Sequence, residues 1–185
     1  MIRVFIGAVV AGLVQFIVGA IAWATPLGML AFKSLGDGPT ADLQAALGRT
    51  LGPTGTGTYF IPSPETAAGT AMLGNGPVAL IHFNTLGFPP MSVTALLTGL
   101  ILSVVMMWLV GSALSYVRDF AARFKVTVLF ATGTVLYLLL AMPVFNEYLP
   151  WDWWIYLAAT DFLAFVAGAY VMIRWFMPRE ATPAL

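Results

Sequence analysis

Four long apolar stretches constrain the fold of this chain more than any other feature of its sequence. They cover residues 4–24, 93–117, 126–145 and 153–173 and carry almost no charged side chains. A helix rises about 1.5 Å per residue, so about 20 residues cross the ~30 Å hydrocarbon core of a bilayer. The sequence therefore predicts an all-α integral membrane protein with four transmembrane helices in a single membrane domain, residues 1–185.

The composition supports the same class and excludes several others. Hydrophobic residues make up 60% of the chain and charged residues 9%, whereas soluble domains carry about 25% charged residues. Eight basic residues balance eight acidic ones, which argues against nucleic acid as a partner. The chain has no cysteine, so thiolate ligands and a cysteine nucleophile are excluded. We predict no cofactor and no metal site, and expect contacts with lipid or pigment at most.

The basic residues favour one orientation in the membrane. Cytoplasmic flanks of transmembrane helices are enriched in Lys and Arg. Six of the eight basic residues fall on one side of the predicted spans: Arg3, Arg118, Arg123, Lys125, Arg174 and Arg179. We therefore expect a multi-pass protein of a bacterial inner membrane, with both termini cytoplasmic and loop 32–90 extracytoplasmic. The first apolar run continues past Ala22 to Leu30, longer than a usual signal-peptide core, and is interpreted as an uncleaved signal anchor.

Short linkers follow the second and third apolar stretches. They predict that the last three spans pack as antiparallel neighbours in a four-helix bundle. Loop 32–90 differs because it is rich in Gly, Pro and Thr, and we expect it to form a small α+β segment. Its predicted elements are a helix over 40–47, strands over 58–61 and 78–83, and a helix beginning at Ser63-Pro64-Glu65.

Small residues recur at helical spacing in three of the apolar stretches. Such faces let transmembrane helices approach closely, and we predict helix packing through Ala8, Gly12, Gly19, Gly99, Ser103, Ala164 and Gly168. Gln15 lies in the centre of the first of these faces and is predicted to bond a neighbouring helix.

Asp161 is the main candidate functional residue. It lies eight residues beyond Trp153, roughly 12 Å below the predicted outer interface. An intramembrane charge costs at least ~2.5 kcal/mol, so such residues are protonated, hydrogen-bonded or hydrated. Two interpretations remain open: a proton relay or substrate contact, and a protonated aspartic acid that joins helices through hydrogen bonds, which the lack of a second titrating group favours.

Two other patterns carry less weight. The Gly-rich run 52–58 lacks the lysine that a phosphate-binding loop requires, so nucleotide binding is not expected. His82 is the single histidine, and a catalytic or metal site would need Asp37, Asp42 or Glu65 beside it. We interpret His82 as a structural or interface residue, and predict an outer-loop interface of His82, Tyr59 and Phe60.

The absence of a catalytic set indicates that the chain is not an enzyme. The small-residue faces favour an accessory or structural subunit of a larger membrane complex, such as one of respiratory or photosynthetic energy conversion, with other integral membrane subunits as partners. The alternative is a small oligomeric transporter or channel component that uses Asp161. These hypotheses differ in one observable, because a transport residue should face a cavity whereas a structural one should be sealed among side chains.

Overall fold

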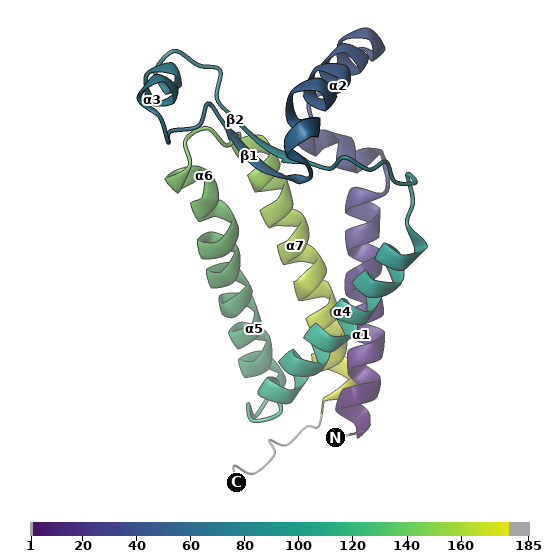
Figure 1. The fold of residues 1–185 in the computed structure, drawn as a ribbon. Helices are drawn as coiled ribbons and strands as arrows, with labels where there is room; N and C mark the ends of the chain where they lie inside the picture. The colour runs from purple at the N-terminus through teal and green to yellow at the C-terminus, as the bar shows by residue number, and fades with distance from the viewer. Residues whose placement is uncertain (1, 178–185) are drawn as a thin grey trace. The chain divides into compact units, whose positions relative to one another are not determined.

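The computed structural model describes residues 2–177. These residues are mostly helical, with four helices long and apolar enough to cross a membrane. Two of them are α1 (Ile2–Trp23) and α4 (Val93–Leu114). The third runs through α5 (Phe120–Thr134), the π-helical segment η3 (Val135–Leu140) and α6 (Ala141–Phe145), and the fourth through α7 (Trp151–Val171) and the π-helical η4 (Met172–Phe176) (Figure 1). The predicted number of apolar helices is confirmed.

The chain divides into two compact units. One holds the four long helices and comprises Met1–Lys33 and Ser92–Leu185. The other is the intervening segment Ser34–Met91. Arg179, part of the predicted charge asymmetry, lies outside the described residues.

The four long helices pack in a different order from the predicted one. α1 packs on both α4 and α7, and α5 packs on α7. Of the last three spans, which were predicted to pack as antiparallel neighbours, α5 and α4 each contact α7, whereas α4 and α5 are not among the principal packed pairs of residues 2–177. A short linker fixes only the adjoining helix ends, and α4 runs obliquely away from α5 (Figure 1).

Small residues explain why α1 holds the central position. A Cβ atom on Gly12 would lie 2.7 Å from the backbone of Val104 in α4. A Cβ on Gly168 of α7 would lie 2.7 Å from the carbonyl oxygen of Ala11 in α1. α1 therefore offers a small residue to α4 and a close backbone approach to α7. Met107 and Met172 are fully buried and fill the space between the three helices, in keeping with the adaptable shape of methionine.

The turn between α4 and α5 is held by side-chain caps. The Asp119 carboxylate accepts a hydrogen bond from the backbone N–H of Ala122 at 2.8 Å, as an N-cap of α5. Arg123 is buried, and its Nε donates to the carbonyl oxygens of Leu114 at 3.2 Å and Val117 at 2.9 Å. A cation suits the C-terminal end of a helix because its carbonyls lack partners there. Helix α5 thus begins at Phe120, six residues before the predicted stretch, and Arg123 lies on the helix rather than in a loop.

An aromatic pair joins the C-terminal end of α1 to the N-terminal part of α7. The Tyr156 hydroxyl donates to the carbonyl oxygen of Ala22 at 2.6 Å, and its ring meets Trp23 edge to face at 5.1 Å. A short 3₁₀ helix, η1 (Pro26–Ala31), follows α1 with Pro26 in its first turn. Lys33 then forms an exposed ion pair with Asp152 at 3.1 Å.

The second unit contains two short strands, two α-helices and the short 3₁₀ helix η2 (Gly52–Thr54). Strands β1 (Gly57–Ile61) and β2 (Ala79–Phe83) pair antiparallel, with Thr58 opposite His82. The strands agree with the sequence prediction to within one residue. Helix α2 (Asp37–Leu51) is longer than predicted, and α3 (Ala67–Leu73) begins after an N-cap at Thr66 rather than at Ser63. The Thr66 hydroxyl accepts from the Gly69 N–H, which places the helix start there.

Candidate functional site

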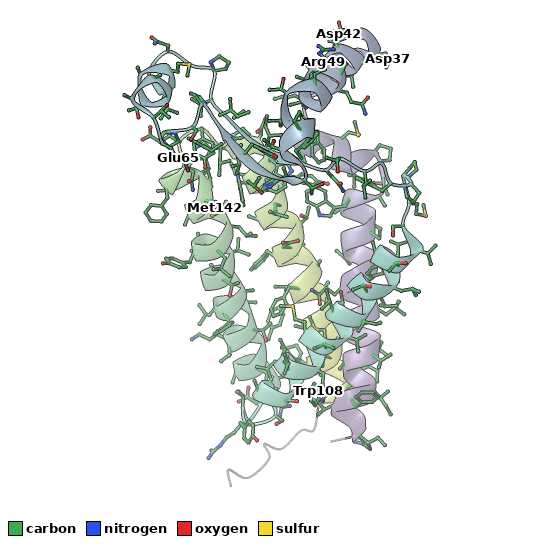
Figure 2. The ribbon with its side chains drawn as sticks, in the orientation of Figure 1. Asp37, Asp42, Arg49, Glu65, Trp108 and Met142 are labelled. Atoms are coloured by element: carbon green, nitrogen blue, oxygen red, sulfur yellow. The ribbon has the colours of Figure 1, made fainter. Side chains whose placement is uncertain are left out.

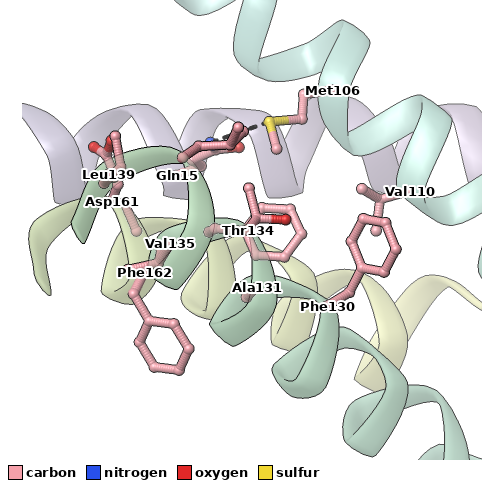
Figure 3. Close-up of a pocket in the computed structure, with 13 residues that line it drawn as sticks. Gln15, Met106, Val110, Phe130, Ala131, Thr134, Val135, Leu139, Asp161 and Phe162 are labelled. Atoms are coloured by element: carbon pink, nitrogen blue, oxygen red, sulfur yellow. Dashed lines mark hydrogen bonds between the residues drawn. The ribbon is translucent and has the colours of Figure 1, made fainter. Parts of the chain in front are cut away.

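Asp161 lines a half-open cavity of about 500 Å³ within the unit of four long helices. All four helices contribute to its wall. Figure 3 shows Asp161 and Leu139 toward one end of the cavity, with Phe130 and Val110 toward the other. The lining residues are Gln15, Met106, Val110, Phe130, Ala131, Thr134, Val135, Leu138, Leu139, Asp161, Phe162, Ala164 and Phe165. Ten of these thirteen side chains are apolar, so the cavity is an apolar space with a single ionisable group.

Small side chains form the deep part of the cavity and large ones its mouth. Ala131 of α5 and Ala164 of α7 are both 5% exposed. Phe130 and Leu138, by contrast, are 74% and 60% exposed. α4 and α5, which both contribute lining side chains, are not among the principal packed helix pairs of residues 2–177.

The Asp161 carboxylate makes no hydrogen bond or ion pair within residues 2–177 and is exposed to the cavity. None of the basic side chains in the described part of the chain lines this space. Arg123 is engaged with the end of α4, and Lys33 with Asp152. Residues 2–177 therefore supply no counter-charge to Asp161.

Gln15 is the second polar residue of the cavity. Within residues 2–177, only the nitrogen of its side-chain amide has a hydrogen-bond partner. Its Nε2 donates to the Met106 sulfur at 3.8 Å, shown as the dashed line in Figure 3. Its Oε1 atom is buried and has no hydrogen-bond partner within residues 2–177. A buried carbonyl of this kind costs stability unless a partner reaches it. Within residues 2–177, a buried acceptor without a partner on Gln15 thus accompanies the exposed, unpaired carboxylate of Asp161.

One wall of the cavity is an irregular helix. Val135, Leu138 and Leu139 belong to η3, where the Ala141 N–H donates to the Leu136 carbonyl in the i to i−5 pattern of a π-helix. Pro143 follows one turn later and cannot donate to residue 139. π-Helical turns inside α-helices are frequent at functional sites. The sequence prediction did not use Pro143, although this proline was the available signal.

The predicted helix-packing residues divide into three groups. Gly12 and Gly168 lie at the closest helix approaches, and Ala8 and Ala164 are buried. A Cβ on Gly99 would lie in ordinary contact with the Phe16 ring, and the Ser103 hydroxyl donates to the Gly99 carbonyl of its own helix. A Cβ on Gly19 would meet no atom within 4 Å. The sequence prediction missed three residues that pack equally closely, namely Gly7, Ala11 and Gly111.

The predicted outer-loop residues lie on the hairpin of the second unit. His82 is exposed, and its Nδ1 lies 3.0 Å from the Thr58 hydroxyl on the paired strand. The Tyr59 hydroxyl donates to the Gly55 carbonyl at 2.6 Å, and Phe60 pairs with Leu80 across the strands. His82 and Tyr59 are thus engaged within their own hairpin.

The acids considered as partners of His82 lie on other elements of that unit. Figure 2 shows Asp37 and Asp42 on α2, beside Arg49, and Glu65 in the segment before α3. Among residues 2–177, no group of three or more His, Cys, Asp or Glu side chains is placed to hold a metal ion. Of the two candidate residues Asp161 and His82, Asp161 is therefore the one whose surroundings indicate a functional role.

Comparison of the chain with protein-family models, with curated proteins and with solved structures finds no match.

Proposed function

We propose that this chain is a multi-pass membrane protein whose Asp161 cavity is an intramembrane binding site, used in a small oligomeric transporter or channel component. One observation carries the proposal: Asp161 faces an open cavity and has no partner among residues 2–177. An acid in a membrane span is expensive and usually marks a substrate or ion path. Four helices enclose little space, so a pore would need further copies. The proposed role is not enzymatic.

Several features support a membrane-embedded role for the four long helices. Their apolar windows are mostly exposed, with only 6% of the window in α4 and 11% of that in the third helix buried. Water does not favour so large an apolar surface, whereas lipid solvates it. In the proposed orientation, in a bacterial inner membrane, both termini are cytoplasmic and loop 32–90 is extracytoplasmic.

The orientation can be tested with single cysteines, because the natural chain has none. Arg118→Cys lies in the turn between α4 and α5, and Glu147→Cys in the turn between α6 and α7. In intact spheroplasts, an impermeant maleimide should label the Glu147→Cys variant and label Arg118→Cys only after lysis. The reverse pattern would overturn the proposed orientation.

The binding-site proposal is tested by reagent access to the cavity. Thr134→Cys lines the cavity, whereas Leu136→Cys lies two residues away on an exposed surface outside it. A thiol in hydrocarbon stays protonated and does not react with a water-soluble thiosulfonate. We expect modification of Thr134→Cys and little modification of Leu136→Cys in native membranes. Protection of both thiols would contradict an accessible site.

A second candidate function is an accessory or structural subunit of a larger membrane complex, respiratory or photosynthetic complexes included. The separation of α4 from α5 favours it, since a partner helix could pack between them. In that case Thr134→Cys should be protected in native membranes and become reactive on detergent extraction. Native mass spectrometry of a gentle extract should then show a stoichiometric integral membrane partner.

A further inference from the structure

The Asp161 cavity combines a charge, a volume and wall chemistry that together select one class of ligand. This inference rests on the proposed function, because it names what the intramembrane site would bind. The first element is charge. Asp161 is the one ionisable side chain among the thirteen that line the cavity, and the described residues bring no cation to it. A carboxylate removed from bulk water needs a proton or a positive ligand beside it.

The second element is the chemistry of the wall. Phe130, Phe165 and Met106 line the cavity together with aliphatic side chains of η3. Aromatic faces attract cations through the negative charge of the ring quadrupole, and aliphatic walls favour apolar substituents. The Phe162 ring points away from Gln15 and Met106 in Figure 3 and contributes less to this environment.

The third element is size. A volume of about 500 Å³ falls within the ~300–1,000 Å³ typical of sites for drug-sized molecules. A bare metal cation would leave most of this space empty. It would also need about six oxygen ligands if it were calcium or magnesium, whereas the side chains here offer oxygens only from Asp161, Gln15 and Thr134.

We propose that the cavity binds a lipophilic organic cation, a substituted ammonium or phosphonium with aromatic or alkyl groups, which enters from the bilayer through the gap between α4 and α5. Its positive centre lies against the Asp161 carboxylate, and its substituents occupy the space between Phe130, Phe165 and the aliphatic residues of η3.

The probe for this proposal is tetraphenylphosphonium, with tetraphenylborate as the control of similar shape and opposite charge. Binding is measured by equilibrium dialysis on the full chain in lipid nanodiscs, with empty nanodiscs subtracted. We expect saturable binding of the phosphonium at one site per chain. Tetraphenylborate should bind at least 10-fold more weakly.

Three variants show whether the binding occurs in the cavity. Asp161→Asn keeps the side-chain shape and should weaken phosphonium binding at least 10-fold, whereas Asp161→Glu should keep most of it. Asp152→Asn removes an acid from the same helix outside the cavity and should leave binding unchanged. Thr134→Phe adds a ring to an exposed cavity position and should also weaken binding. Size-exclusion profiles and circular dichroism establish that each variant is folded.

The possible failures are distinguishable from one another. Equal binding of phosphonium and borate, or equal binding by Asp161→Asn and the natural chain, would overturn the cation proposal. Absence of phosphonium binding combined with a reactive Thr134→Cys would overturn the ligand class and leave the proposed function standing. A Thr134→Cys thiol that is protected in native membranes and exposed on extraction, together with a stoichiometric integral membrane partner in native mass spectrometry, would show that a protein helix occupies the cavity, and would refute both.

Discussion

Replacing Gly168 by alanine should force α7 away from α1. The added Cβ would lie 2.7 Å from the Ala11 carbonyl oxygen, about 0.7 Å short of the 3.4 Å at which ordinary contact begins. The obstructing atom belongs to the backbone, so no rotamer change can relieve the clash. The two helices must separate by a few tenths of an ångström or more along their contact.

The expected loss of stability follows from the looser contact between α1 and α7. A gap of 0.5–1 Å forfeits about a quarter to a half of the dispersion energy of the atoms that line it, and overpacking of this kind costs about 1–3 kcal/mol. Alanine is also a better helix former than glycine by about 1 kcal/mol. Gly19→Ala on α1 isolates the contact term, because its Cβ would meet nothing within 4 Å. We expect Gly168→Ala to be less stable than Gly19→Ala by about 2 kcal/mol.

The difference can be measured by reversible unfolding in mixed micelles, with sodium dodecyl sulfate titrated into a mild detergent and helicity followed by circular dichroism. Gly133→Ala on α5 provides a second control, since its Cβ would also be free. Gly12→Ala should resemble Gly168→Ala because its Cβ would meet the Val104 backbone at 2.7 Å. Equal unfolding midpoints for Gly168→Ala and Gly19→Ala would refute the close α1–α7 approach.

The same unfolding assay tests three further contacts. Met107→Ala removes a fully buried side chain and should lower the free energy of unfolding by about 2–5 kcal/mol; a loss under 1 kcal/mol would contradict its packed position. Arg123→Met removes the charged cap of the last α4 carbonyls and should cost about 1.5–3 kcal/mol, whereas Lys125→Met, an exposed neighbour, should cost far less. Tyr156→Phe loses the hydrogen bond to the end of α1 and should cost about 0.5–1.5 kcal/mol. Tyr137→Phe, at a side chain 75% exposed, is its control, and equal effects of the two changes would argue against that bond.

Hydropathy predicted the apolar helices well because crossing a bilayer imposes a length that can be read directly from the sequence. It did not predict which helices touch. Gly12, Gly19 and Gly99 look equivalent in a list of small residues, yet only Gly12 lies against another helix backbone. The direction in which each glycine faces depends on helix tilt and rotation, which arise from all contacts together.

The candidate site was only partly accessible to prediction for a similar reason. Asp161 was identified because an acidic side chain is energetically costly in an apolar span. That argument does not depend on which residues surround it. The cavity beside it depends on the separation of α4 from α5 and on the π-helical segment before Pro143. Arg123 was assigned to a loop by its charge, because hydropathy cannot register a guanidinium whose Nε donates to the carbonyls of a neighbouring helix end.

The central position of α1 has a consequence for biogenesis. α1 is synthesised before α4, and α4 can dock on it as soon as α4 enters the bilayer. The next helix to be made, α5, has its packing partner in α7, which is synthesised later. During that interval, Arg123 on the end of α4 is the contact that can retain α5 beside the growing assembly. A ribosome stalled before Trp151 would therefore leave α5 tethered at one end and otherwise surrounded by lipid.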